Sequence, residues 1–200
     1  MEEKQVLISI SRSYGSGGRA IAAKIAADLG LPLYDRNLLE QMTDERVIKT
    51  EEYKHVDDRP HIWMHSRKVR GYSNSIEDNL MELQFDYLRK KADEGQSFVI
   101  VGRCAESALK DYPGLISIFV SGNWENRIER IMELQNLGRK EALNKIRRVD
   151  KARMTYHNRY SKHKWGTAIG YHLCINSSFL GVDGTTEVLE KYIEDRRKMW

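Results

Sequence analysis

A short glycine-rich segment near the N-terminus has the residue types of an anion-binding loop. Residues 13–19 read SYGSGGR and follow an apolar stretch, residues 6–11, that is rich in β-branched side chains. Glycines tolerate positive φ angles, so successive backbone N–H groups can point toward one anion, and a following helix adds unpaired donors from its first turn. The segment is therefore suited to hold phosphate. A tight strand-to-helix connection needs the same small residues, and the loop alone fits both explanations.

Arginine side chains stand near the predicted loop and near later segments, where they could neutralise phosphate charge. Phosphoryl transfer is catalysed mainly by positioning and charge neutralisation, and one well-placed arginine can be worth about 10³- to 10⁵-fold in rate. Arginines that converge on one anion could therefore replace the lysine that a phosphate loop ordinarily carries. The candidates are Arg12, Arg19, Arg36, Arg103, Arg147, Arg148 and Arg153.

The second half of the chain contains a strongly basic segment, residues 139–165. It holds ten lysines and arginines but only two acids, whereas the whole chain has 33 basic and 29 acidic residues. A positive segment on a weakly negative body indicates an anionic partner, and a solvated basic helix face is the alternative. Tyr156, Tyr160 and Trp165 lie between the basic residues and could stack on RNA bases, but such aromatics more often face a core or an interface.

The elements that would position the loop form a strand–helix–strand unit. Residues 6–11 predict a strand buried on both faces, and apolar residues at helical spacing over 21–29 predict a helix. Gly30 is placed to end that helix, and residues 31–35 predict a second strand that ends in Asp35. This order of elements is typical of parallel α/β sheets.

Further strands and helices alternate along the rest of the chain. Residues 36–74 are polar and irregular and interrupt the pattern as an insertion. A helix is predicted to open at Ser75, a second to contain Trp124 and Ile128, and a third to close the chain with Leu189 and Ile193 on its apolar face. The further predicted strands are residues 98–101, 116–120 and 172–176.

Length and composition indicate one folded domain of ordinary size in the cytoplasm. The chain has 200 residues, of which 40% are hydrophobic and 31% charged. Its acidic start does not fit a secretory signal, and the longest uncharged stretch, residues 165–182, is too polar to span a bilayer. Two cysteines and six histidines show no metal-ligand spacing, so no metal site is predicted. The net charge of +4 is too small to indicate a nucleic-acid-binding protein.

The motifs taken together resemble the cytidylate kinases, a family of P-loop nucleoside monophosphate kinases. The register holds without a gap from the first predicted strand to Asp35, and SRxYGSGGR is similar to the group called cytidylate kinase-like, whose loop is altered. The resemblance extends over nearly the whole chain and is weakest over residues 36–97. Its other matches are VIVGR at residues 99–103, the pair Asp150 and Arg153, and Asn176-Ser177-Ser178.

The resemblance implies a fold and a domain organisation. The fold is the three-layer α/β/α P-loop NTPase fold, with a five-stranded parallel sheet in the strand order 2-3-1-4-5. The chain would form a single kinase-like domain over residues 1–200, with an acceptor-binding insertion at residues 36–96 and an arginine-rich lid at residues 136–166.

The loop departs from the ordinary P-loop, which reads GxxxxGK[ST]. In the ungapped register with the cytidylate kinases, Arg12 stands at the first glycine, Gly18 at the lysine and Ala20 at the hydroxyl position. A shift of one residue places Ser13 and Arg19 at the glycine and lysine positions, so Arg19 is the expected substitute cation. Val101 and Cys104 stand where the cytidylate kinases carry acids. The cofactor expected from the resemblance is ATP, with Mg²⁺ held mainly by phosphates and water.

The resemblance and the predicted strand ends imply roles for individual residues. The donor phosphates and ATP would contact Ser13, Tyr14, Gly15, Ser16, Gly17, Gly18, Arg19 and Ala20, with Asn176 near the donor base. The acceptor would contact Arg12, Asp35, Arg36 and Arg103, although Asp35 could instead cap a helix and Arg103 could form a surface ion pair. The catalytic arginines would be Arg19, Arg147, Arg148 and Arg153, with Asp150 orienting Arg153 or forming a structural ion pair with it.

Two functions follow from these features. The first is an ATP-dependent phosphotransferase that acts on a nucleoside monophosphate or a similar small phosphorylated acceptor. The alternative is a catalytically degenerate protein that binds a nucleotide or another anion as a regulator, which the altered Gly18, Ala20, Val101 and Cys104 positions favour. The expected partner is a nucleotide or small phosphorylated substrate, without a membrane and with nucleic acid less favoured. The sequence leaves the oligomeric state open.

Overall fold

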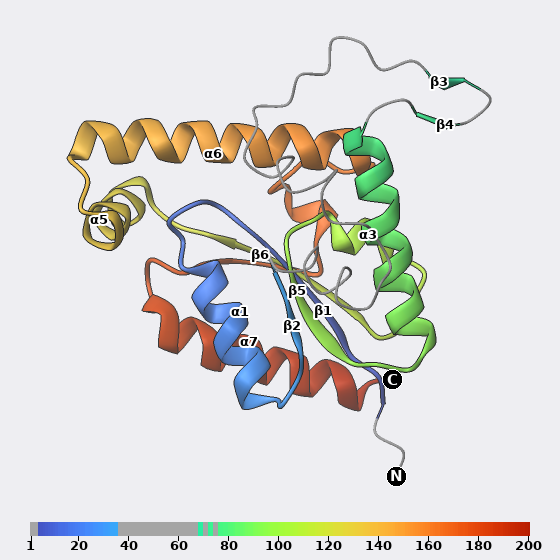
Figure 1. Cartoon of the computed structure of the whole chain (residues 1–200). Coiled ribbons are helices and arrows are strands. Elements are labelled where there is room, and N and C mark those ends of the chain that lie inside the picture. The colour runs from blue at the N-terminus through green and yellow to red at the C-terminus, as the bar shows by residue number, and fades with distance from the viewer. Residues whose placement is uncertain (1–3, 36–67, 70–71, 74–75) are drawn as a thin grey trace.

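Five parallel strands form the sheet at the centre of the molecule (Figure 1). The computed structural model describes residues 4–35, 68–69, 72–73 and 76–200. Along the sheet the strands follow the order β2-β5-β1-β6-β7, which is 2-3-1-4-5 when only these five are counted. The predicted strand order is therefore confirmed. The strands are β1 (Leu7–Arg12), β2 (Leu33–Tyr34), β5 (Phe98–Val101), β6 (Leu115–Ser121) and β7 (Leu173–Asn176).

Helices cover both faces of the sheet, as the three-layer prediction requires (Figure 1). One face packs against α1 (Gly18–Asp28) and α7 (Gly181–Lys198), and the other packs against α3 (Ile76–Asp93), α4 (Ala105–Ala108) and the C-terminal part of α6. The remaining elements are α5 (Trp124–Gln135), α6 (Arg139–Tyr160), the 3₁₀ turn η2 (Ala168–Gly170) and the antiparallel pair β3 (Lys68–Val69) and β4 (Tyr72–Ser73).

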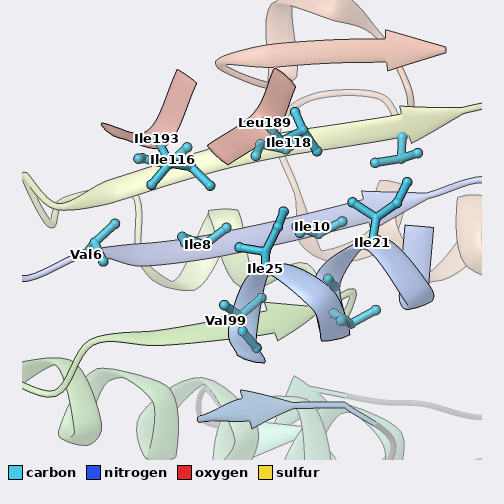
Figure 2. Packing of buried hydrophobic residues seen from close by; sticks show 14 residues of the cluster. Val6, Ile8, Ile10, Ile21, Ile25, Val99, Ile116, Ile118, Leu189 and Ile193 are labelled. Atoms are coloured by element: carbon cyan, nitrogen blue, oxygen red, sulfur yellow. The ribbon is translucent and has the colours of Figure 1, made fainter. Parts of the chain in front are cut away.

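Strand β1 is the middle strand of the sheet. Its successive residues alternate between two buried environments, one on each face. Ile8 and Ile10 point into the cluster formed with α1 and α7, where Ile25 of α1 lies beside them and Ile193 of α7 lies beside Ile116 of β6 (Figure 2). Leu7 belongs to the cluster on the opposite face. Burying an isoleucine side chain contributes about 1.5–3 kcal/mol relative to exposure, so this strand anchors both layers and fixes where its C-terminal end lies.

The glycine loop leads directly into α1, and a glycine with a positive φ flanks this helix at each end. Gly17 precedes the helix with a φ of +79°, and Gly30 follows it with a φ of +64°. The amides of Gly30 and Leu31 donate to the carbonyls of Ala27 and Ala26 at 3.2 and 2.8 Å, which closes the C-terminus. The predicted helix end at Gly30 is confirmed.

The arginine-rich helix α6 is connected to the sheet through α5. Ile128 and Ile131 of α5 pack against Ala142 and Ile146 of α6 in a separate small core. At the other end of α6, Tyr160 donates to Asp78 Oδ1 of α3 at 2.5 Å. The helix is therefore anchored at both ends, and its middle passes the glycine loop. None of the described helices combines the length and the apolar character needed to cross a membrane.

Candidate functional site

The loop between β1 and α1 is folded so that only glycine fits at two of its positions. Gly15 has a φ of +83°, and a Cβ on it would lie 2.8 Å from the carbonyl oxygen of Arg127 in α5. Gly17 also has a positive φ, and a Cβ there would lie 3.0 Å from Val182 Cγ2 in α7. Both backbone conformation and close packing therefore explain these glycines.

Serine hydroxyls fix the shape of the loop. Ser16 Oγ donates to the carbonyl oxygen of Ser13 at 2.9 Å, and the amide of Ser13 donates to the carbonyl oxygen of Val120 at 3.0 Å. Ser177, buried at the end of β7, donates to the carbonyl oxygen of Ser16 at 2.6 Å. The sequence placed Ser177 in a motif but gave it no role, and the structure shows that it ties the loop to the far edge of the sheet.

Several loop amides remain available to a ligand. Among the described residues, the N–H groups of Gly15, Gly17, Arg19 and Ala20 have no hydrogen-bond partner. Those of Arg19 and Ala20 belong to the first turn of α1, which also carries the positive end of the helix dipole. The loop therefore presents backbone donors without protein acceptors at the carboxyl edge of the central strand, where ligands of open parallel sheets bind.

Tyr14 connects the loop to α5 and α6. Its amide donates to Asp150 Oδ1 at 2.7 Å, and its carbonyl oxygen accepts from Arg127 Nε at 2.7 Å. Arg127 also pairs with Asp150 through Nη2, and both side chains are largely buried. The sequence predicted that Asp150 orients Arg153. In the structure the Asp150 carboxylate instead pairs with Arg127 and accepts from the Tyr14 amide. Arg153 instead donates from Nη1 to the carbonyl oxygen of Arg12 at 3.0 Å and lies over the Tyr14 ring.

The remaining predicted arginines lie in different surroundings. Arg19 is 66% exposed and pairs through Nε with Asp35, which is 8% exposed, so two predicted site residues contact each other. Arg103 follows β5 with a positive φ of +60° and is half-buried. Arg147 and Arg148 are exposed on α6, and their role as lid arginines stays a prediction. Arg36 lies outside the described residues.

Asn176 lies at the end of β7 and organises a neighbouring loop. Its Nδ2 donates to Asn123 Oδ1 at 2.9 Å, and its Oδ1 accepts from the amide of Ser178 at 3.0 Å. The amide of Asn123 in turn donates to Ser178 Oγ at 2.8 Å. These bonds connect the β7–α7 turn to the loop between β6 and α5, and a contact of Asn176 with the donor base stays a prediction.

A buried polar cluster under α6 was missed by sequence reasoning. Glu106 Oε1 of α4 lies 2.7 Å from His157 Nε2 of α6, and Tyr171 Oη lies 3.2 Å from the same nitrogen. Ser9 of β1 donates to Glu106 Oε2 at 3.3 Å. Burial raises the pKa of the nearby Cys104 thiol, and the Glu106 carboxylate raises it further. These residues lie far apart in the sequence, so no local spacing could have brought them together.

The atom types of this cluster could suit a metal ion. Ligand atoms of Cys104, Glu106 and His157 lie within 4.8 Å of one another. Without a metal ion, the contact between His157 and Glu106 has the length of a hydrogen bond, and the raised pKa of Cys104 favours the neutral thiol. In this structure the cluster is therefore a network of hydrogen bonds.

The described residues around the loop do not fit a Mg²⁺ ion that the protein ligates directly. Ala20 stands at the hydroxyl position, and Ser16 Oγ is already engaged with Ser13 and Gly18. The carboxylates of Asp35 and Asp150 are paired with arginines. Since hard cations need such oxygens, a Mg²⁺ ion at this loop would have to be held by phosphates and water.

Comparison with known proteins identifies relatives of the whole chain. The family model described as the cytidylate kinase-like family matches residues 7–179. A solved structure of an uncharacterized protein from Eubacterium ventriosum is 36% identical, with a TM-score of 0.76 over 95% of this chain and 99% of that chain. Shikimate kinase from Bacteroides thetaiotaomicron is 16% identical, with a TM-score of 0.55 over 94% of this chain and 98% of that chain, and shares the fold.

The family match covers most of the chain and agrees with the resemblance inferred from the glycine loop. No curated protein matches the chain. The match over residues 7–179 includes the loop, the polar cluster and α6, so it extends well beyond a shared phosphate loop. The chain belongs to the cytidylate kinase-like family.

Proposed function

We propose that the protein is an ATP-dependent phosphotransferase that acts on a nucleoside monophosphate or a similar small phosphorylated acceptor. The observation that carries this proposal is the glycine loop, whose unpartnered amides among the described residues lie at the carboxyl edge of β1. Arg153 of α6 donates to the carbonyl oxygen of Arg12 just before the loop, and the Arg12 guanidinium lies beside Gly102 at the end of the neighbouring strand β5. Such a site provides the donors and the positive charge that a transferring phosphoryl group needs.

In the proposed reaction the donor phosphates lie on the amides of Gly15, Gly17, Arg19 and Ala20, which have no partner among the described residues. An oxygen of the acceptor phosphate attacks the γ-phosphorus of ATP, and the bond from that phosphorus to the bridging oxygen breaks, so that ADP leaves with the electron pair. Asp35, Arg36 and Arg103 would bind the acceptor beside the insertion, residues 36–96. Where ATP brings Mg²⁺, phosphate oxygens and water would hold the ion.

The lid in this proposal is the segment 136–166, and Arg153 is its main catalytic group. Arg153 is the predicted lid arginine with a bond to the strand that precedes the loop. A guanidinium there can neutralise charge that develops on the transferring group. Arg147 and Arg148, which are exposed on α6, would close over the transferring group with the rest of the lid.

The test is direct detection of product with purified protein. ATP is incubated with Mg²⁺ and a panel of nucleoside monophosphates, and phosphorylated products are separated by ion-exchange chromatography. We expect a product with at least one acceptor, and Arg153→Ala to lower the rate by about 100-fold or more. Lys151→Ala, which removes an exposed charge from the same helix, should not change the rate. The absence of product across the panel would contradict the proposal.

The second candidate is a regulator that binds a nucleotide or another anion without turnover. The specific observation in its favour is the altered loop, in which Gly18 and Ala20 replace the lysine and the hydroxyl residue of an ordinary P-loop. Equilibrium titration distinguishes the two functions. ATP binding of equal affinity with and without Mg²⁺, together with no product in the assay above, would favour the regulator.

A further inference from the structure

The Arg12 side chain fills the space that a side chain at position 18 would need. Arg12 is the last residue of β1, and Gly18 is the first residue of α1. A Cβ on Gly18 would lie 2.6 Å from Arg12 Cβ and 3.1 Å from Arg12 Cγ. These separations are too short for two side chains. An arginine at position 12, in this conformation, therefore requires glycine at position 18.

The far end of the Arg12 side chain reaches the neighbouring strand. A Cβ on Gly102, the first residue after β5, would lie 2.2 Å from Arg12 Nη1 and 3.4 Å from Cζ. The guanidinium thus lies at the carboxyl ends of β1 and β5, which are adjacent strands of the sheet. Ligands of open parallel sheets bind at this edge, and the side chain is partly exposed to solvent.

Arg19, the cation that the sequence favoured, is directed elsewhere. Its Nε pairs with the largely buried carboxylate of Asp35 at the end of β2, at the edge of the sheet. That position is two strands away from β1 in the strand order. Arg12 carries the guanidinium that the structure places at the end of the central strand.

We propose that Arg12 binds the terminal phosphate of the donor nucleotide in place of the P-loop lysine. An ordinary P-loop has glycine at its first position and lysine six residues later, and here the two positions hold Arg12 and Gly18. The positive charge has moved from the start of the helix to the end of the strand. An arginine there can hold phosphate through two parallel hydrogen bonds. The inference rests on the proposed function and moves Arg12 from the acceptor site to the donor site.

The first experiment is calorimetric titration of ATP, and separately of CMP, into the wild type and single variants. Arg12→Gln keeps a polar stem against Gly18 but removes the charge, and it should weaken ATP binding by about tenfold or more. CMP affinity should change by less than about twofold, and Arg19→Gln should weaken ATP binding by less than about threefold. Lys24→Gln is the matched control, because Lys24 is an exposed cation of α1 that pairs with Asp183.

A second variant reverses the exchange and keeps the test valid if Arg12→Gln does not fold. Arg12→Gly combined with Gly18→Lys recreates the ordinary arrangement and should bind ATP within about threefold of the wild type. Arg12→Gly alone should lose about as much affinity as Arg12→Gln. Gly18→Lys alone should be destabilised, because the lysine stem would collide with Arg12. Circular dichroism and thermal unfolding monitor the fold of each variant.

The outcomes separate this inference from the proposed function. Wild-type ATP affinity in Arg12→Gln overturns the inference, and so does a loss of CMP rather than ATP binding. If the wild type binds ATP and Arg12→Gln does not, but no product forms, the kinase proposal fails and the role of Arg12 is upheld. If the wild type does not bind ATP, both are overturned.

Discussion

The two faces of the central sheet both carry apolar clusters, but the C-terminal half of β1 meets different chemistry on each face. On the face toward α1 and α7, β1 contributes Ile8 and Ile10 to a cluster of aliphatic side chains (Figure 2). On the other face, Ser9 is buried and donates to Glu106, and Ser11 is buried beside it. Apart from Leu7, which joins the apolar cluster of the second face, β1 thus contributes apolar packing to one face and buried hydroxyl groups to the other.

This difference indicates a division of labour between stability and positioning. The apolar face gains its stability from burial, which is non-directional. The polar face fixes geometry, because hydrogen bonds are directional and an unpaired buried group is costly. His157 of the polar cluster lies four residues after Arg153, so both lie on the same side of α6. The cluster therefore anchors the helix that carries the proposed catalytic arginine.

The largest expected effect on stability comes from the apolar face. Ile10→Ala should lower the free energy of unfolding by about 2–5 kcal/mol, because it leaves a cavity in a fully buried site. The ATP dissociation constant of the folded protein should not change. Urea unfolding measures the first quantity and calorimetry the second. Ile10→Val, which deletes one methyl group, is the conservative control, and a changed ATP affinity in either variant would contradict the division.

A substitution on the polar face should weaken ATP binding as well as lower stability. Glu106→Gln removes the carboxylate that faces His157 and should cost about 1.5–3 kcal/mol of stability. It should also weaken ATP binding several-fold, because a less firmly anchored α6 places Arg153 less accurately. The same urea and calorimetric measurements apply. Unchanged ATP affinity in a folded Glu106→Gln protein would show that the cluster serves stability alone.

The two cysteines provide a test that needs no substitution. Burial raises the pKa of both thiols, but Cys104 lies within the buried polar cluster whereas Cys174 is exposed on β7. Under native conditions at pH 8, iodoacetamide should modify Cys174 while Cys104 remains unmodified, because only an accessible thiolate reacts. Both should react in urea. Peptide mass spectrometry identifies the modified residue, and rapid native labelling of Cys104 would show that the polar face is open to solvent.

The smallest expected effect concerns His172 at the start of β7. Its Nδ1 accepts from the amide of Ser117 at 3.2 Å, which requires a neutral ring nitrogen. Burial lowers the His172 pKa below its ordinary value of 6.5, and the charge of Arg196 lowers it further. The unfolded chain therefore binds the proton more readily, so this contribution to stability is complete above pH 6.5 and decreases as the pH falls below it. His172→Gln should flatten that slope in urea titrations between about pH 5 and 7.

Local patterns in the sequence predicted most of the fold. The strand over residues 98–101 was predicted with the bounds that the structure has, and the end of α1 at Gly30 was predicted from its positive φ requirement. These features depend on neighbouring residues, so periodicity and glycine placement reveal them. The strand order depends on contacts between distant segments, and it came from the family resemblance.

The candidate site was less predictable, because it depends on where long side chains end. Spacing alone favoured Arg19 as the substitute cation, but Asp35 at the end of β2 pairs with it. Spacing also suggested that Asp150 and Arg153 pair, whereas Asp150 contacts Arg127 from α5. The meeting of Glu106 with His157 joins two helices and has no local signal apart from an acid within an apolar helix. Each of these contacts depends on packing between elements.

The most direct test of the central claim is a crystal structure of the protein with a non-hydrolysable ATP analogue. We expect the triphosphate to lie on the amides of residues 15–20, with the Arg12 guanidinium within hydrogen-bond distance of the γ-phosphate and Arg153 beside it. A triphosphate bound elsewhere, or one bound at the loop with Arg12 turned away and another cation on its γ-phosphate, would contradict the account.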